Sequence, residues 1–418
     1  MSGRLFAIIV LTTAFLSPLL FTKIGGVNIT ASDLAIISLA LLIIFVGRIP
    51  PLPPFYWLLS IIALIGGGFS TLMAVDIYAS LAHWVQYGFI LFVAIPVGYY
   101  IGYRPELHVY IIYGYVLAGL YLLFQSYTEI TSGAAQFVAA GRYAGDYGSV
   151  GSLAFSLACI IPFIAVAPAF ARELPARIFL STLALGTISG LLWLMLHTAS
   201  RTGLLCLIVT FLIMLFMALR NSARDGGSQK SLMVVMLCGV AAFVWWISAS
   251  EVYSFAYDRI QNSSADGFGA RGTMLMNVKD RVDVRSVVIG VGFQGGTQLT
   301  DSGFRPHNAL LLFLIEGGII FFISLAIILL IMPLKSIRAL KKGSEVDKTA
   351  HLFVVAGLCA FASYFIIMMF NTQSLHRLYW LNYGLFIGVA RYLQLKISHR
   401  SQFAVGDVEP CVCYRRVV

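Results

Sequence analysis

The residues of this chain that are best suited to chemistry are basic and imidazole side chains at the edges of apolar segments. Arg201 lies in the short stretch Thr198–Gly203 between two apolar runs, and Arg305 and His307 come just before a third. An arginine held at bilayer depth costs about 2.5–3.5 kcal/mol, so a turn this short suggests an anionic partner. Guanidinium binds phosphate in a bidentate manner, and a neutral imidazole accepts a proton or a hydrogen bond from a hydroxyl.

The same side chains also suit roles without any chemistry. His307 follows Pro306, and proline favours the first helical turn. We therefore expect His307 in that turn, where the helix dipole disfavours the imidazolium. The alternative is a histidine that caps the helix or lies at the membrane interface. Arginines at helix ends also extend toward the interface without any substrate, which accounts for Arg305 and Arg377 as well as a functional role does.

Glu316 is the one carboxylate that we expect deep in an apolar segment. It lies nine residues into its segment, which is about 13 Å at 1.5 Å per residue. A carboxylate inside the membrane is a functional candidate by default, although Glu316-Gly-Gly equally suits a close contact between helices. The nearby Gly290 and Gly292 have no βαβ context, which excludes a dinucleotide site. We expect them in a turn where the backbone approaches the membrane or a substrate.

The sequence gives little sign of a metal site or a cofactor. The outer segments contain no D-x-D motif, and Asp280 and Asp283 alternate with basic residues as on a salt-bridged surface. Cys411 and Cys413 form a C-x-C motif that lacks the second ligand pair of a zinc site. We therefore expect no metal and no cofactor.

These residues belong to a chain whose composition is that of a membrane protein. Of its 418 residues 59% are hydrophobic and 11% are charged, and its mean hydropathy is +0.88. A soluble domain carries about 25% charged residues, and a membrane span needs about 20 mostly apolar ones. We therefore expect an all-α polytopic membrane protein with about twelve transmembrane helices. The expected spans are residues 5–22, 31–47, 55–73, 81–102, 107–126, 149–170, 178–197, 203–219, 231–249, 308–333, 350–370 and 378–395.

Charge predicts the orientation of these spans. With both termini in the cytoplasm, 18 of the 28 Lys and Arg residues are cytoplasmic, and six of the others lie in one long outer loop, residues 250–306. Long loops are exempt from the positive-inside rule. The basic residues on the cytoplasmic side therefore explain much of the +10 net charge, and no nucleic-acid partner is expected. Helical spacing of Arg271, Leu275, Val278 and Val282 predicts one or two short helices in this loop, with an apolar face on the bundle. Residues 1–395 then form the membrane domain, and residues 396–418 form a polar cytoplasmic tail that we expect to be disordered.

Four short motifs resemble, in order, those of the O-antigen ligase and polysaccharide polymerase superfamily. They are Ser200-Arg-Thr-Gly-Leu-Leu205, Ala270-Arg-Gly272, Gly290-Val-Gly-Phe293, and His307-Asn308 with Glu316-Gly317. The resemblance implies a membrane glycosyltransferase fold of the C type. It also implies transfer of a glycan from undecaprenyl diphosphate to an acceptor at the outer face of the bacterial inner membrane, without a metal and with inversion.

The resemblance also implies roles for particular residues. Arg201 and Arg271 would bind the diphosphate, and His307 would handle the acceptor hydroxyl. Without a metal, arginines must stabilise the charge that develops on the leaving diphosphate. The further candidate substrate-binding residues are Arg142, Arg305, Asn308, Glu316 and Arg377. The implied partners are the lipid-linked glycan donor, a lipid A-core or glycan acceptor, and membrane lipids.

Three alternatives remain. A ligase and a polymerase need the same motifs. A polymerase would suit a second large basic outer loop, to hold a second carrier lipid or a growing chain. The other outer segment, residues 128–148, is short and has Arg142 as its one cation. This favours the ligase. A transporter or flippase would place ionisable groups near the membrane midplane, and the first nine expected spans carry no central charge. A non-catalytic assembly subunit is the third alternative.

Overall fold

The computed structural model shows a chain that is helical almost throughout. It describes residues 3–19, 30–46, 52–134, 137–138, 142–144, 149–225, 276, 278–299, 305–371 and 375–403. The first half contains α1 (Gly3–Leu16), α2 (Ala31–Phe45), α3 (Pro54–Leu72), α4 (Ile77–Phe89), the π-helix η1 (Ile90–Ala94), α5 (Ile95–Tyr103), η2 (Pro105–Leu107), α6 (His108–Thr131), α7 (Val150–Ala165), η4 (Ala167–Phe170) and α8 (Leu174–Thr198). The second half contains α9 (Arg201–Asp225), α13 (Val284–Val288), η5 (Gly295–Leu299), α14 (Ala309–Ile337), η6 (Arg338–Lys341), α15 (Gly343–Val346), α16 (Lys348–Phe370) and α17 (Arg377–Phe403).

One pair of two-residue strands accompanies these helices. Strand β1 (Phe137–Val138) pairs antiparallel with β2 (Arg142–Tyr143). Apart from this pair, the elements in the described part of the chain are helices, which confirms the predicted class.

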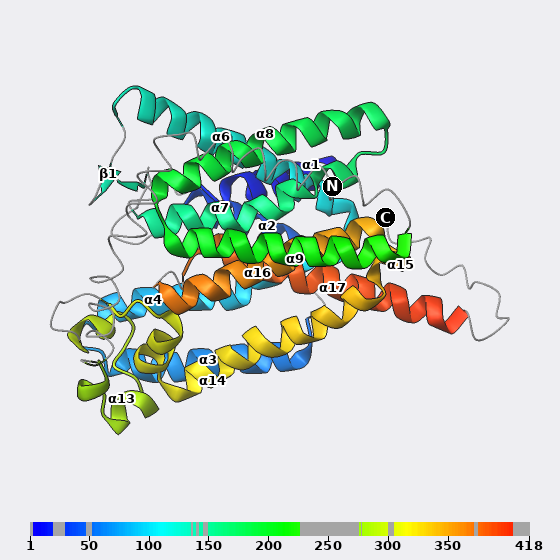
Figure 1. The fold of residues 1–418 in the computed structure, drawn as a ribbon. Coiled ribbons are helices and arrows are strands. Elements are labelled where there is room, and N and C mark those ends of the chain that lie inside the picture. The colour runs from blue at the N-terminus through cyan, green and yellow to red at the C-terminus, as the bar shows by residue number, and fades with distance from the viewer. Residues whose placement is uncertain are drawn as a thin grey trace.

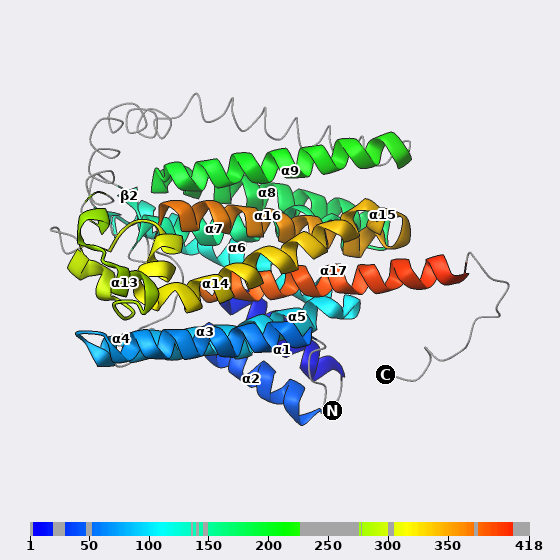
Figure 2. The same cartoon turned by 90° about the horizontal axis from the view of Figure 1, so that it is seen from below.

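The long helices lie side by side in one bundle (Figures 1 and 2). Helix α13 and the strand pair lie at one end of the bundle, which we call the α13 end. The start of α1, helix α15 and the end of α17 lie together at the opposite end. Helix α14 packs along α3, and α17 packs between α5 and α16.

Many of these helices are able to cross a membrane. Seven helical segments within the described ranges have the required length and apolar composition, namely Pro54–Leu72, Ile77–Tyr103, Pro105–Thr131, Leu174–Thr198, Arg201–Arg220, Ala309–Leu340 and Lys348–Phe370. Three shorter apolar helices are Arg4–Leu16, Ala31–Phe45 and Val150–Ala165. The chain is therefore a polytopic membrane protein. Each expected span in the described part coincides with a helix, whereas the expected span 231–249 lies outside it, and the total of twelve stays a prediction.

Glycines allow the closest helix contact of the bundle core. Gly98 and Gly102 on α5 face Gly384 and Gly388 on α17, and a Cβ added at any of the four would overlap backbone atoms of the other helix. Small residues four positions apart let two membrane helices approach until their backbones touch, and dispersion then stabilises the pair. This contact fixes α17, whose first turn lies toward the α13 end.

The C-terminal boundary differs from the sequence prediction. The segment 396–418 was expected to be disordered, but α17 continues to Phe403. The added turns are held at the end of the bundle opposite α13. Lys396 Nζ lies 2.8 Å from Asp347 Oδ2, and Arg400 donates a 2.7 Å hydrogen bond to a backbone carbonyl of α15. Polar composition alone could not reveal these partners, because they lie about 50 residues earlier in the chain.

Candidate functional site

Arg201 lies at the first position of α9, directly after the tight turn that the sequence predicts. Helix α8 ends at Thr198, and Ala199 adopts a left-handed conformation with φ of 44° that reverses the chain. Ser200 caps α9, because its hydroxyl accepts a 3.2 Å hydrogen bond from the Gly203 N–H. A cation at a helix N-terminus opposes the helix dipole, whereas an anion there is stabilised by the dipole, by the first N–H groups and by the guanidinium. The position of Arg201 therefore favours an anionic ligand over a purely structural role.

His307 and Asn308 precede α14, and here one prediction is wrong. His307 was expected in the first helical turn, but α14 begins at Ala309. The reason is that Asn308 is the N-cap residue, and its Oδ1 accepts a 3.0 Å hydrogen bond from the Leu311 N–H. His307 is exposed one position before the cap. It still lies at the positive end of the helix dipole, while the side-chain oxygen of Asn308 is engaged by the helix itself.

Arg305 and Glu316 form a buried ion pair, which we call the Arg305–Glu316 clasp. Arg305 Nε donates a 3.0 Å hydrogen bond to Glu316 Oε1, and a second guanidinium nitrogen binds Oε2. The Gly296 N–H also donates to Oε1, at 3.2 Å. Burial by itself lowers the pKa of Arg305, but the charge of Glu316 and its hydrogen bonds outweigh burial and raise that pKa. The clasp ties the segment before α14 to the interior of that helix.

The glycines of the Gly290-Val-Gly-Phe293 motif dock against a break in α14. Gly318 has φ of 78° and ψ of 171°, so the helix is interrupted at this residue. The interruption leaves carbonyl groups available, and the Val291 N–H donates a 2.9 Å hydrogen bond to the Ile315 carbonyl. Gly290 has φ of 96°, and a Cβ there would overlap the Glu316 carbonyl oxygen. These glycines therefore form a turn that packs directly on α14.

The same turn is anchored on α3 and α4. The Gly292 N–H donates a 2.9 Å hydrogen bond to Ser70 Oγ, and the Phe293 N–H donates a 2.8 Å hydrogen bond to Ser80 Oγ. The Phe293 ring is buried, with its centroid 5.0 Å from that of Tyr87. The turn therefore joins three membrane helices and supports the segment that carries His307.

The rest of the outer segment packs as its spacing predicts. Val278 and Leu299 are buried together with Ile315 of α14, and Val282 packs against this group. The short helix α13 follows, with the Asp283 carboxylate accepting a 2.7 Å hydrogen bond from the Ser286 N–H. The prediction is confirmed in part: the helical turn at residues 278–281 places Val278 on the bundle, whereas α13 has no buried residue.

Arg377 lies at the start of α17 and has a partner that sequence reasoning missed. Its Nε donates a 2.8 Å hydrogen bond to Asp33 Oδ1, and another nitrogen donates a 2.9 Å hydrogen bond to the Leu375 carbonyl. The other oxygen of Asp33 accepts from the Thr30 N–H at 2.8 Å and so caps α2. The pair joins the first helical turns of α2 and α17 at the α13 end. It gives Arg377 a structural task beside the predicted contact with substrate.

Arg142 belongs to the strand pair at the α13 end. Arg142 lies in β2 opposite Val138, and its strand contacts α8. The neighbouring Tyr143 is buried and donates a 2.6 Å hydrogen bond to Glu129 Oε2, which holds the strand on α6. Arg271 lies outside the described residues.

The predicted residues that the structure describes gather at one end of the molecule. Strand β2 and the starts of α9, α14 and α17 all lie toward the α13 end (Figures 1 and 2). His376, which sequence reasoning missed, is buried in the same region. Its Nε2 lies 3.4 Å from Ser156 Oγ, and its Nδ1 has no hydrogen-bond partner among the described residues. Its position beside Arg377 was the one signal that could have identified it.

The acidic, histidine and cysteine side chains do not suggest a metal centre. In the described ranges, no group of three or more His, Cys, Asp or Glu residues could hold a metal ion. Guanidinium groups at this end belong to Arg201, Arg305 and Arg377, at the starts of α9, α14 and α17. These can stabilise a diphosphate through charged hydrogen bonds.

Comparison with known proteins adds no family assignment. No model of a protein family matches the chain, and no characterised protein gives a match. The fold and the site define a broader class, an all-helical polytopic membrane protein whose candidate functional residues lie together at one end of its bundle.

Proposed function

We propose that this protein is a membrane glycosyltransferase of the C type that moves a glycan from undecaprenyl diphosphate to an acceptor hydroxyl. The observation that carries the proposal is the position of Arg201, at the positive end of α9. The start of α14, which His307 precedes by two residues, lies at the same end of the bundle. The four ordered motifs that resemble the O-antigen ligase superfamily support it. The acceptor in the proposed reaction is lipid A-core, and the site is at the outer face of the bacterial inner membrane.

The proposed chemistry assigns one task to each group. The acceptor oxygen attacks the anomeric carbon of the donor sugar, and the bond from that carbon to the diphosphate oxygen breaks with inversion. The diphosphate leaves with the bonding electrons, and Arg201 and Arg271 stabilise its charge. His307 accepts the proton of the acceptor hydroxyl or orients that hydroxyl for attack.

The arrangement of the terminal helices supports the proposed orientation. The start of α1 and the end of α17 lie at the end of the bundle away from α13. Basic residues favour the cytoplasmic side in short connections, and η6 together with the segment before α16 is rich in lysine and arginine. The α13 end would then face the periplasm, where a lipid-linked glycan meets its acceptor.

A transporter remains the competing function from another class, and one observation favours it. Transporters often use interrupted helices whose freed backbone groups bind an ion or a substrate, and α14 is interrupted at Gly318. In this chain, however, the backbone carbonyl of Glu316 accepts from Ser70 and its carboxylate is held by the clasp. The break is therefore filled by the protein itself, which favours the enzyme.

A deletion and complementation experiment tests the proposed function and its acceptor. Cells without the gene should accumulate polymer on the carrier lipid and leave the lipopolysaccharide core uncapped. Arg201→Ala should fail to restore capping, whereas Arg104→Ala should restore it. Arg104 is a matched control, because it is an arginine at the end of the bundle opposite α13, away from the candidate site. It pairs with Glu106 at 3.3 Å. Accumulation of single repeat units would instead identify a polymerase.

A further inference from the structure

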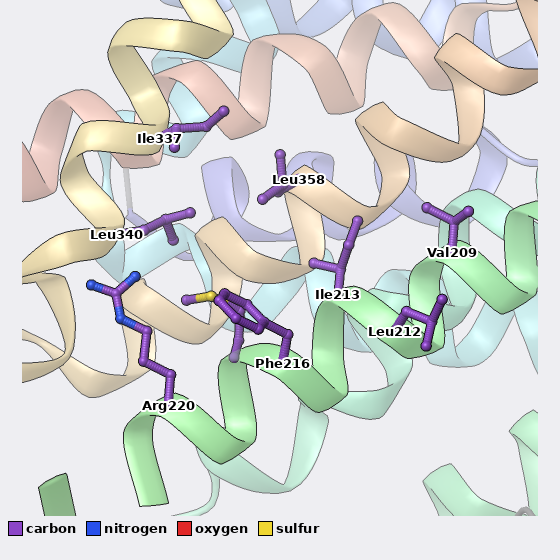
Figure 3. Close-up of a pocket in the computed structure, with 9 residues that line it drawn as sticks. Val209, Leu212, Ile213, Phe216, Arg220, Ile337, Leu340 and Leu358 are labelled. Atoms are coloured by element: carbon purple, nitrogen blue, oxygen red, sulfur yellow. The ribbon is translucent and has the colours of Figure 1, made fainter. Parts of the chain in front are cut away.

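An apolar groove lies between α9, the end of α14 with η6, and the first half of α16, away from the α13 end (Figure 3). Its volume is about 390 Å³, which is within the range of small-molecule sites. Its lining residues are Val209, Leu212, Ile213, Phe216, Met217, Arg220, Ile337, Leu340 and Leu358. All but one of these side chains are hydrocarbon or thioether, so the groove suits a hydrocarbon chain.

The groove follows one face of α9. Its α9 residues recur at intervals of three and four positions from Val209 to Arg220, which places them on a single helix face. The eleven steps from Val209 to Arg220, at 1.5 Å each, span about 16 Å. This is roughly half of the 30 Å hydrocarbon thickness of a bilayer. The groove therefore has the length of an acyl chain in one leaflet.

Among the residues that line this groove, Arg220 is the charged one. Figure 3 shows the Arg220 guanidinium extending across the groove toward Leu340 and Ile337. No carboxylate of the described residues forms an ion pair with Arg220, and Arg338 lies exposed on the adjacent η6. Arg220 lies in the last turns of α9, at the end of that helix away from α13, which is the cytoplasmic end in the proposed orientation. An apolar channel with a cation at its headgroup end is complementary to an anionic lipid.

We propose that this groove binds one acyl chain of an anionic phospholipid from the cytoplasmic leaflet, with the phosphate of its headgroup on Arg220. The inference does not depend on the proposed glycosyltransferase function. The length of one leaflet favours a phospholipid over the much longer carrier lipid. Because the groove contacts α9 directly, a bound lipid would stabilise the helix whose first residue is Arg201.

Native mass spectrometry of the purified full-length protein tests this proposal. The protein in detergent is mixed with phosphatidylglycerol or with phosphatidylcholine of the same chain length, and the fraction carrying one lipid is measured. Phosphatidylglycerol should bind more tightly. Arg220→Gln should weaken its binding about fivefold, the effect of one basic residue near an anionic headgroup, whereas Arg220→Lys should preserve most of it. The matched control is Arg172→Gln, an exposed arginine between η4 and α8 at the same end of the bundle.

A groove-filling variant gives an independent readout. Leu358→Trp should reduce binding of both lipids, because the ring occupies the space of the acyl chain, while the variant keeps the elution profile of the parent protein. The proposal is overturned if Arg220→Gln and Arg172→Gln bind phosphatidylglycerol equally well. It is also overturned if Leu358→Trp binds lipid like the parent protein. That result is expected if another part of this chain, such as the expected span 231–249, fills the groove.

Discussion

The Arg305–Glu316 clasp makes the most quantitative prediction about this fold. Glu316→Gln removes the negative charge but keeps an oxygen that accepts from the Gly296 N–H. Loss of one partner from a buried ion pair costs about 3–5 kcal/mol, because the other charge stays buried. The side chain of Glu316 is 2% exposed and that of Arg305 is 22% exposed, so water stabilises part of the remaining charge. We therefore expect a loss near the lower bound, about 3 kcal/mol of unfolding free energy.

Reversible unfolding in mixed micelles, followed by tryptophan fluorescence, measures this loss. The matched control is Glu106→Gln, which breaks the ion pair with Arg104 by the same substitution. The side chain of Glu106 is 59% exposed, so this change should cost less than about 1 kcal/mol. A double variant, Arg305→Met with Glu316→Leu, replaces the clasp by apolar side chains and should be more stable than Glu316→Leu alone. If the effects of Arg305→Met and Glu316→Leu add without coupling, the clasp does not contribute as an ion pair and the reasoning fails.

Three further predictions concern the backbone, pH and topology. Gly318→Ala should destabilise the protein by about 1–3 kcal/mol, because the backbone conformation of Gly318 is nearly restricted to glycine. Gly186→Ala should be neutral or stabilising in the same unfolding assay, because a Cβ there meets open space. Burial raises the pKa of Asp347, but the Ala350 N–H and the Lys396 ammonium outweigh burial and lower that pKa. An unfolded Asp has a pKa of about 3.9. The stability that Asp347 adds should therefore be present above that pH and disappear as the pH falls below it. Unfolding curves of Asp347→Asn and of the parent protein should converge in acid. In a cysteine-free background, a membrane-impermeant thiol reagent should label Val284→Cys from the periplasm and Lys342→Cys only after the membrane is opened; the reverse pattern would contradict the orientation.

Hydrophobic segment length predicted the helical layout well, for a physical reason. A backbone inside a membrane must satisfy its own hydrogen bonds, so each long apolar segment becomes a helix. The turn at Thr198–Gly203 also followed from sequence, because two long apolar runs are separated by too few residues for anything else. Pro54 is the first residue of α3, as the preference of proline for helix starts predicts.

The partners of the charged residues could not be predicted in the same way. Asp33 and Arg377 are 344 positions apart, and no periodicity connects them. Glu316 was correctly singled out as buried, but its partner Arg305 and the interruption at Gly318 depend on how the outer segment folds back onto α14. His307 was predicted in the first turn of its helix because proline prefers helix starts. Asn308 caps the helix instead, so His307 lies just before it.

The proposed function is tested most directly by glycan transfer with purified components. The protein in proteoliposomes is supplied with an undecaprenyl-diphosphate-linked glycan and lipid A-core in the presence of EDTA, and the glycosylated product is measured. The proposal predicts transfer by the parent protein, a rate lowered about 10²–10³-fold in Arg201→Ala, and severe impairment in His307→Ala, with Arg104→Ala unaffected. Arg201→Lys should also be poor, since an ammonium cannot reproduce the bidentate fork. Full activity of Arg201→Ala, or activity that requires an added divalent metal, would contradict the proposal.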